Sequence, residues 1–301
     1  MRWLIRCALL LVTATLALGV YSFLSFDAAR PLAGEAGSVQ VEGRRVAYSL
    51  SGRGPTVVML ASAGRSASDF NELIAELSAA GYRSLAIEAP GVGDSDPISD
   101  PEVSLHDLAA NVAAVVDAVG PASETRVFVL GHAFGNRVAR AFASAFPERV
   151  RATLLLAAGG RVPPEIDIEK AFETIFAAAL PDSVRVPVIQ GAFFAGDNPV
   201  PDHWVSGWYP STLLIQTRAT SQTPVESWWD AGGAPILVLQ PGDDVLAPPG
   251  NAELLRQAFP ERVRVVEIPN AGHALLPERP ERVAHHVVEF LDARSGEQPQ
   301  G

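Results

Sequence analysis

A strand that turns directly into a helix, at residues 127–143 (VFVLGHAFGNRVARAFA), constrains the fold of this chain more than any other segment. It begins with a continuous apolar run, as in a strand buried on both faces of a sheet. Gly131 and Gly135 then allow a tight turn in which the backbone and the following helix pass close together. Such a turn points residue 133 out of the sheet at a helix N-terminus, where developing negative charge is stabilised.

Strands and helices alternate along most of the chain. Residues 39–52 alternate apolar and polar side chains around Gly43, which predicts a β-hairpin. Apolar runs and helical spacing predict strands at 56–62, 83–90, 126–130, 150–160, 234–240 and 262–269, and further helices near 68–80, 104–120, 251–258 and 280–293. This order predicts an α/β fold with a mostly parallel sheet and helices on both of its faces.

The alternation stops between Gly160 and Gly233. This region is rich in proline, alanine and aromatic residues, and after residue 29 it holds all the tryptophans: Trp204, Trp208, Trp228 and Trp229. We interpret residues 160–233 as a helical lid inserted over the ends of the strands. Residues 30–159 and 234–293 then form the core, and residues 294–301 a frayed tail.

The N-terminal segment differs from the body of the chain. Arg2 and Arg6 precede an uncharged run from Cys7 to Phe26, and about twenty apolar residues are enough to span a bilayer. Residues 1–29 are therefore predicted to be a signal peptide or a membrane anchor, with the body exported or held on the extracytoplasmic side. Contact with the membrane is expected only through residues 1–26. Cys7 is the only cysteine, so the body has no disulfide.

The charge distribution argues against a nucleic-acid partner. The formal net charge is −11, and the basic residues are scattered, whereas nucleic-acid binding depends on neutralising phosphates. The histidines lack the spacing of metal ligands, and no glycine-rich phosphate loop opens a helix. We expect no cofactor and no metal, and a small molecule as the partner. The sequence does not define an oligomeric state.

Two later loops complete a recognisable pattern. LQPGDDVLAPPGN, at residues 239–251, follows a predicted strand and carries Asp244, and IPNAGHALLPERPERV, at residues 268–283, follows the last strand and carries His273. Together with the turn at position 133, these loops make the chain resemble an α/β-hydrolase from about Val39 to Leu291. In that family the three loops carry a nucleophile, an acid and a histidine in this order.

The resemblance implies roles for individual residues. His273 would transfer protons, and Asp244 would fix its tautomer and stabilise its charged form, with Asp243 as the alternative acid. The backbone N–H groups of Ala63 and Phe134 take the places of the donors that bind an oxyanion.

Ala133 departs from the family pattern, because it stands where the family has its nucleophile. Alanine has no heteroatom and cannot form a covalent acyl intermediate. A second departure is the run ASAGRS after the strand at 56–62, where the family usually has His-Gly. Four explanations of Ala133 remain open: a laboratory substitution for serine, an Asp244–His273 dyad that activates water or serves as acid and base, ligand binding without catalysis, and Ser62 as a substitute nucleophile.

These observations favour an enzyme that acts on a small, mostly apolar ester or carbonyl compound through Asp244 and His273. The alternative is a catalytically inactive protein that binds a small hydrophobic ligand. The substrate-binding candidates are Ser62, Arg65, His132, Trp204, Trp208 and Trp228. Of these, Arg65 would hold an anionic group or form an exposed salt bridge, and at least one tryptophan would belong to the core. We expect Ser95 to be a hydrogen-bonded structural residue.

Overall fold

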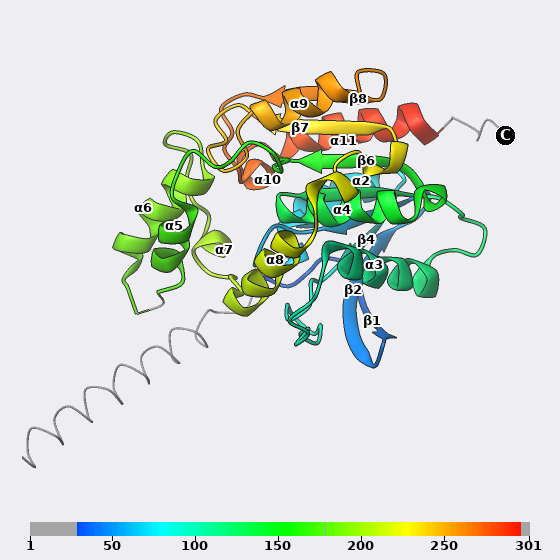
Figure 1. Cartoon of the computed structure of the whole chain (residues 1–301), viewed down its shortest axis with the longest axis horizontal. Coiled ribbons are helices and arrows are strands. Elements are labelled where there is room, and N and C mark those ends of the chain that lie inside the picture. Colours follow the sequence, from blue (N-terminus) through cyan, green and yellow to red (C-terminus); the bar gives the residue numbers. More distant parts are fainter. Residues whose placement is uncertain (1–28, 178, 296–301) are drawn as a thin grey trace, which may run out of the picture.

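The computed structural model describes residues 29–177 and 179–295. Its centre is an eight-stranded sheet in the order β1-β2-β4-β3-β5-β6-β7-β8 (Figure 1). The strands are β1 (Glu35–Val41), β2 (Arg44–Gly52), β3 (Thr56–Leu60), β4 (Arg83–Ile87), β5 (Val127–His132), β6 (Val150–Leu156), β7 (Ile236–Pro241) and β8 (Val263–Ile268). The pairs β1–β2 and β2–β4 are antiparallel, and the others in this sheet are parallel. The mostly parallel sheet is therefore confirmed.

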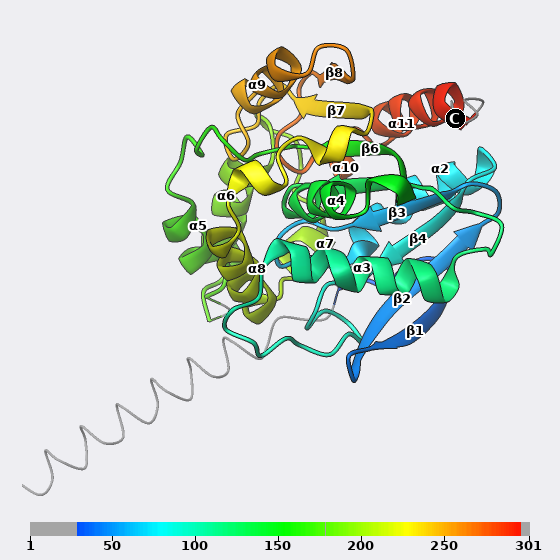
Figure 2. The same cartoon turned by 45° about the vertical axis from the view of Figure 1, so that its right-hand side comes forward.

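The central strands are apolar throughout because helices cover both faces of the sheet. Every residue of β3, β5 and β7 is buried. Helices α3 (Leu105–Val119), α4 (Phe134–Ala145) and α9 (Gly250–Ala258) share one hydrophobic cluster with the sheet. Helices α2 (Asn71–Ala79), α10 (Leu275–Glu278) and α11 (Pro280–Ser295) share the cluster on the other face. Figure 2 shows these layers from a second side.

Helix ends follow local chemistry where the sequence provides a cap. Ser104 accepts a hydrogen bond from the Asp107 N–H, and the Asp107 side chain accepts one from the Ser104 N–H, so α3 begins with a capping box. The predicted tail begins too early, because α11 continues through Ser295. A tertiary contact explains the difference, since the Ser295 hydroxyl lies 3.2 Å from the Tyr82 hydroxyl. Residues 296–301 of the predicted tail lie outside the described residues.

The region between β6 and β7 is helical. It contains α5 (Ile168–Ile175), α6 (Asp182–Phe193), α7 (Asp202–Val205) and α8 (Pro210–Gln222). Short 3-10 helices lie here and elsewhere in the described chain: η1 (Ala67–Phe70), η2 (Pro147–Arg149), η3 (Val225–Ser227) and η4 (Ala231–Gly233). In Figure 1, α5, α6 and α7 gather beyond one end of the sheet. The function of this insertion as a lid stays a prediction.

No helix in the described ranges is long and apolar enough to cross a membrane. The predicted signal peptide or anchor falls, apart from Ala29, outside the described residues.

Candidate active site

The turn between β5 and α4 has an unusual backbone at Ala133, with φ 50° and ψ −111°. This conformation costs a non-glycine residue about 1–3 kcal/mol. Both flanking glycines are required by close backbone contacts. A Cβ at Gly135 would overlap the carbonyl oxygen of Leu60, and a Cβ at Gly131 would overlap that of Gly135. The strained turn of a nucleophile elbow is therefore present, although its central side chain is a methyl group.

A buried polar network holds this turn in place. The Asn136 side-chain amide donates to the Ala133 carbonyl, and its own carbonyl oxygen accepts from Arg140. Arg140 also donates to the backbone carbonyl of Gly159, at 2.6 Å, which ties α4 to the segment after β6. The guanidinium carbon of Arg140 lies 4.5 Å from the centre of the Trp228 ring. The elbow is thus supported from within the core rather than by residue 133.

Asp244 and His273 lie together, after β7 and β8 respectively. Nδ1 of His273 is 3.0 Å from each carboxylate oxygen of Asp244. Asp244 also accepts backbone N–H bonds from Leu246 and Ala247, at 2.9 and 2.8 Å. Both side chains are buried, so the carboxylate holds the imidazole in one orientation. Asp243, the alternative acid, has no hydrogen bond to His273 in the described structure; its N–H donates to the Ala271 carbonyl.

His132 lies beneath this pair and not in the cavity. Its Nε2 lies 2.8 Å from the backbone carbonyl of His273, so it donates there. Complete burial, with the nearby His273, lowers the pKa of His132 to about 4, and its imidazole is therefore neutral at physiological pH. The expectation that His132 contacts substrate is wrong. It positions the backbone of His273, the residue expected to transfer protons.

Two backbone donors lie beside position 133. Ala63 follows β3 and Phe134 opens α4, and both border the same cavity. Within the described residues, neither N–H group has a hydrogen-bond acceptor. The loop that carries Ala63 is fixed on both sides. The Gly64 N–H donates to the Gln216 side chain at 2.7 Å, and the buried carboxyl of Glu88 accepts from the Ser66 hydroxyl at 2.6 Å.

A cavity of about 380 Å³ joins these groups. Ser62, Ala63, Ala133, Phe134 and His273 border it from the loops that follow β3, β5 and β8. This volume suits a small ligand, since ligand pockets are typically about 300–1,000 Å³. The apolar lining on the insertion side comes from two phenylalanines, Phe172 and Phe193, among other residues.

The structure corrects the predicted role of Arg65. The side chain is buried, pairs with Asp69 at 2.7 Å, and donates to the backbone carbonyls of His203, Ser206 and Gly207. Its guanidinium carbon lies 4.4 Å from the ring centre of Trp204 and 4.6 Å from that of Trp208. Arg65 is therefore neither exposed nor in the cavity, and it joins the loop after β3 to the insertion.

The tryptophans are also corrected. Trp204 and Trp208 are buried in the core of the insertion, and Trp228 lies in the cluster that packs against α4. None of the three borders the cavity. Phe172 and Phe193, which do border it, were missed. The only signal for them was the aromatic content of residues 160–233, and this content does not distinguish a lining residue from a core residue.

Arg137 was missed as well. It lies one helical turn after Ala133 and borders the cavity. Residues four apart lie on the same face of a helix, so the sequence could have indicated this position. Ser95 does have the expected structural role. Its hydroxyl accepts from the Ala47 N–H and donates to the Glu88 carbonyl, at 2.9 and 3.1 Å.

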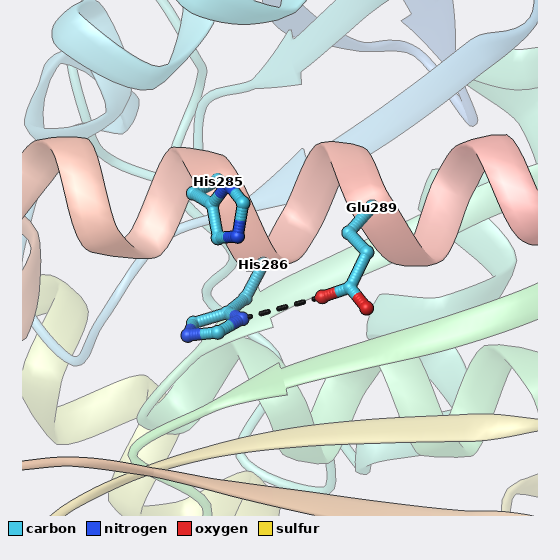
Figure 3. Close-up of side chains that lie close together, drawn as sticks. All are labelled: His285, His286 and Glu289. Carbon is cyan, nitrogen blue, oxygen red and sulfur yellow. Dashed lines mark hydrogen bonds and ion pairs between the residues drawn. The ribbon is translucent and has the colours of Figure 1, made fainter.

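A group of possible metal ligands lies on α11, away from the cavity. The ligand atoms of His285, His286 and Glu289 are within 4.8 Å of one another (Figure 3), although the histidines had appeared unsuitably spaced. Glu289 is already paired with Arg264, at 3.0 Å. A cation bound there would lie beside a guanidinium group, so we assign no metal to the cluster.

Known proteins place this architecture in a family. A model of the alpha/beta hydrolase family matches residues 57–286. The chain therefore belongs to the alpha/beta hydrolase family, as its sheet and its three loops indicate.

Individual relatives are distant. The protein named "Putative non-heme bromoperoxidase BpoC" in Mycobacterium tuberculosis (strain CDC 1551 / Oshkosh) is 27% identical, over 82% of this chain and 97% of its own. A pyrethroid hydrolase of Sphingobium wenxiniae is also 27% identical, over 74% and 83%. The crystal structure of a membrane phospholipase A has a TM-score of 0.69 at 23% identity and covers 98% of this chain and 99% of that one. The structural likeness shows the fold alone.

Proposed function

We propose that the protein binds a small, mostly apolar ester or carbonyl compound in the cavity and acts on it through Asp244 and His273, without a covalent intermediate. One observation carries this proposal. An imidazole oriented by a buried carboxylate borders the same cavity as two backbone N–H groups that have no acceptor among the described residues. Relatives with hydrolase names, such as the pyrethroid hydrolase, support hydrolysis as the reaction.

The reaction we propose uses water in place of a serine. With Nδ1–H of His273 donated to Asp244, the Nε2 lone pair is free to accept a proton from a water molecule as its oxygen attacks the carbonyl carbon. The N–H groups of Ala63 and Phe134 would stabilise the oxyanion that forms. When the bond to the leaving group breaks, His273 returns the proton to the departing oxygen.

The missing nucleophile sets the scale of the expected rate. Loss of a triad serine elsewhere has cost roughly a million-fold in turnover. An oxyanion hole and binding alone still give about 10³–10⁴ over the uncatalysed reaction. Ala133 therefore favours reactive carbonyl compounds or steps that need only proton transfer, rather than rapid hydrolysis of ordinary esters.

A second function is favoured by Ala133 itself. A cavity with no nucleophile would retain a small hydrophobic ligand without turning it over. The pair of Asp244 and His273 favours the catalytic function, because an oriented imidazole that borders the cavity can accept a proton, a capacity that ligand retention does not need.

We also propose an extracytoplasmic location. The two arginines before the apolar run at residues 7–26 support it. Protease accessibility in spheroplasts tests the location, since protection of the body would contradict it.

We further propose that residues 160–233 cover the cavity as a lid. The positions of Phe172 and Phe193 in the cavity lining support that role.

The test of the proposed function is hydrolysis of p-nitrophenyl butyrate, an activated ester, by the full-length protein in detergent. His273→Ala should lower the enzyme-dependent rate about a hundredfold, because a positioned general base contributes roughly 10²–10⁴. His285→Ala, which changes an exposed histidine on α11, is the matched control. Equal rates in the natural protein and His273→Ala would leave ligand binding as the function.

A further inference from the structure

Arg137 introduces a charge into a cavity that is otherwise largely apolar. Of the described residues that border the cavity, it is the one with a permanent charge. It lies on α4 four residues after Ala133, so its Cα is displaced by about 6 Å along the helix axis from the elbow. Thr217 and Thr220 of α8 border the same cavity. A charged and polar subsite therefore adjoins the groups assigned to the reaction.

The guanidinium of Arg137 has no anionic partner among the described residues. It forms neither an ion pair nor a hydrogen bond there, and it lies over the Trp228 ring, whose centre is 5.7 Å from the guanidinium carbon. Burial lowers the pKa of Arg137, because removing a cation from water without pairing it with an anion destabilises its charged form. Its donors remain available to a ligand.

Arg140, one turn further along the same helix face, adds to this uncompensated charge. It is completely buried, and both burial and the proximity of Arg137 lower its pKa. Its hydrogen bonds go to Asn136 and to the Gly159 carbonyl, and its Nη1 has no partner within the described residues. Two neighbouring cations that pair with no carboxylate of the described residues create a positive potential at this wall of the cavity.

Arg65 is a buried arginine with a structural role, and its charge and its N–H donors are fully paired. Its guanidinium is paired with Asp69 and saturated by three backbone carbonyl groups. Arg137 has none of these partners in the described structure, yet it borders the cavity. The contrast favours a ligand as the missing partner of Arg137.

We propose that the natural substrate carries a carboxylate in addition to its reacting carbonyl group, and that Arg137 binds this carboxylate. This inference rests on the proposed function of the cavity and specifies its substrate class. A guanidinium fork matches a carboxylate with two parallel N–H···O bonds, and a single guanidinium at the cavity surface suits a single carboxylate. The displacement of Arg137 from the elbow corresponds to a short carbon chain between the two groups, as in a half-ester of a dicarboxylic acid.

The first measurement is calorimetric binding to the full-length natural protein in detergent, with monomethyl glutarate and monomethyl adipate compared with their dimethyl esters. At least one half-ester should bind about ten- to a hundredfold more tightly than its dimethyl ester. The reason is that hydrogen bonds to a charged group contribute more than hydrogen bonds between neutral groups. Arg137→Gln should abolish this preference, and Arg137→Lys should retain part of it. Arg256→Gln, which removes an exposed arginine of α9, should leave the preference unchanged.

The same variants are then compared in the Ala133→Ser protein, with the ratio of kcat/KM for half-ester and dimethyl ester as the readout. Equal affinity for both esters, no binding of either half-ester, or a preference that persists in folded Arg137→Gln would overturn the inference. Failure of the proposed function is separate, because it appears as a loss of His273-dependent turnover and leaves the binding preference intact. Thermal unfolding of each variant shows whether it is folded.

Discussion

The elbow between β5 and α4 retains the backbone of a catalytic turn, whereas the loops after β7 and β8 retain catalytic side chains. The elbow keeps its backbone, with φ 50° at Ala133 and glycines on both sides, but its central side chain offers no chemistry. The two loops keep their side chains, with His273 held by Asp244 at 3.0 Å. The comparison teaches that the shape of a catalytic turn depends on glycines and buried contacts, and survives without the side chain that it presents.

The largest expected effect comes from restoring the side chain that the elbow lacks. Ala133→Ser should raise hydrolysis of p-nitrophenyl butyrate by at least about 10³-fold, because a triad serine elsewhere accounts for roughly a million-fold. An organophosphonate should label this variant but not the natural protein.

The gain should depend on the other region. Asp244→Asn in the Ala133→Ser background should remove most of it, since the carboxylate holds the imidazole in its working tautomer. If Ala133→Ser is folded yet no faster than the natural protein, the two regions are not aligned for catalysis.

The next largest effect is expected from adding a methyl group at Gly135, where the elbow packs closely against β3. Gly135→Ala should lower the free energy of unfolding by about 3 kcal/mol, because the added Cβ overlaps the Leu60 carbonyl. Denaturant titration measures it. Gly191→Ala is the matched control, since a Cβ at Gly191 meets nothing within 4 Å. A loss of less than about 0.5 kcal/mol for Gly135→Ala would contradict the close packing on which the elbow depends.

His132 links the two regions and should make stability depend on pH. Its pKa in the folded state is about 4, below the value of about 6.5 expected in the unfolded chain. The unfolded state therefore binds a proton first as the pH falls, and the folded state loses about 2 kcal/mol between pH 7 and pH 5 through this group.

His132→Gln should reduce this pH dependence, because glutamine retains a donor for the His273 carbonyl but does not titrate. The measurement is the difference in unfolding free energy between the variant and the natural protein at each pH, which separates His132 from other titrating groups such as Glu88. Burial raises the pKa of Glu88 but lowers that of His132, so the two groups change the stability in opposite directions as the pH falls. A difference that does not change with pH would contradict the buried, neutral state of His132.

The smallest effect is expected at the elbow itself. Ala133→Gly should stabilise the protein by about 1 kcal/mol, because glycine tolerates the positive φ at this position. Chemical denaturation should resolve this gain. A loss of stability would mean that the contacts of the Ala133 methyl outweigh the backbone strain, and the elbow would then depend on its side chain after all.

Much of the fold followed from the sequence because its signals are local. The apolar run at residues 127–130 indicated a buried strand, and Ser104 indicated the start of α3. Which loops meet was implied instead by the resemblance to the α/β-hydrolases, which the order of Ala133, Asp244 and His273 carries. The end of α11 was misjudged, because the contact between Ser295 and Tyr82 joins residues far apart in the chain.

What the sequence by itself determined about this protein is its alternation of strands and helices, the glycine-framed turn at Ala133, and the loops that carry Asp244 and His273. Only the tertiary structure decided which arginine faces the cavity. Arg65 and Arg137 both lie close to the elbow loops, yet Arg65 is saturated by groups such as the His203 carbonyl, 138 residues away, whereas Arg137 is left open to the cavity. Periodicity and turn residues act over a few positions, but the partner of a buried charge is set by packing across the whole chain.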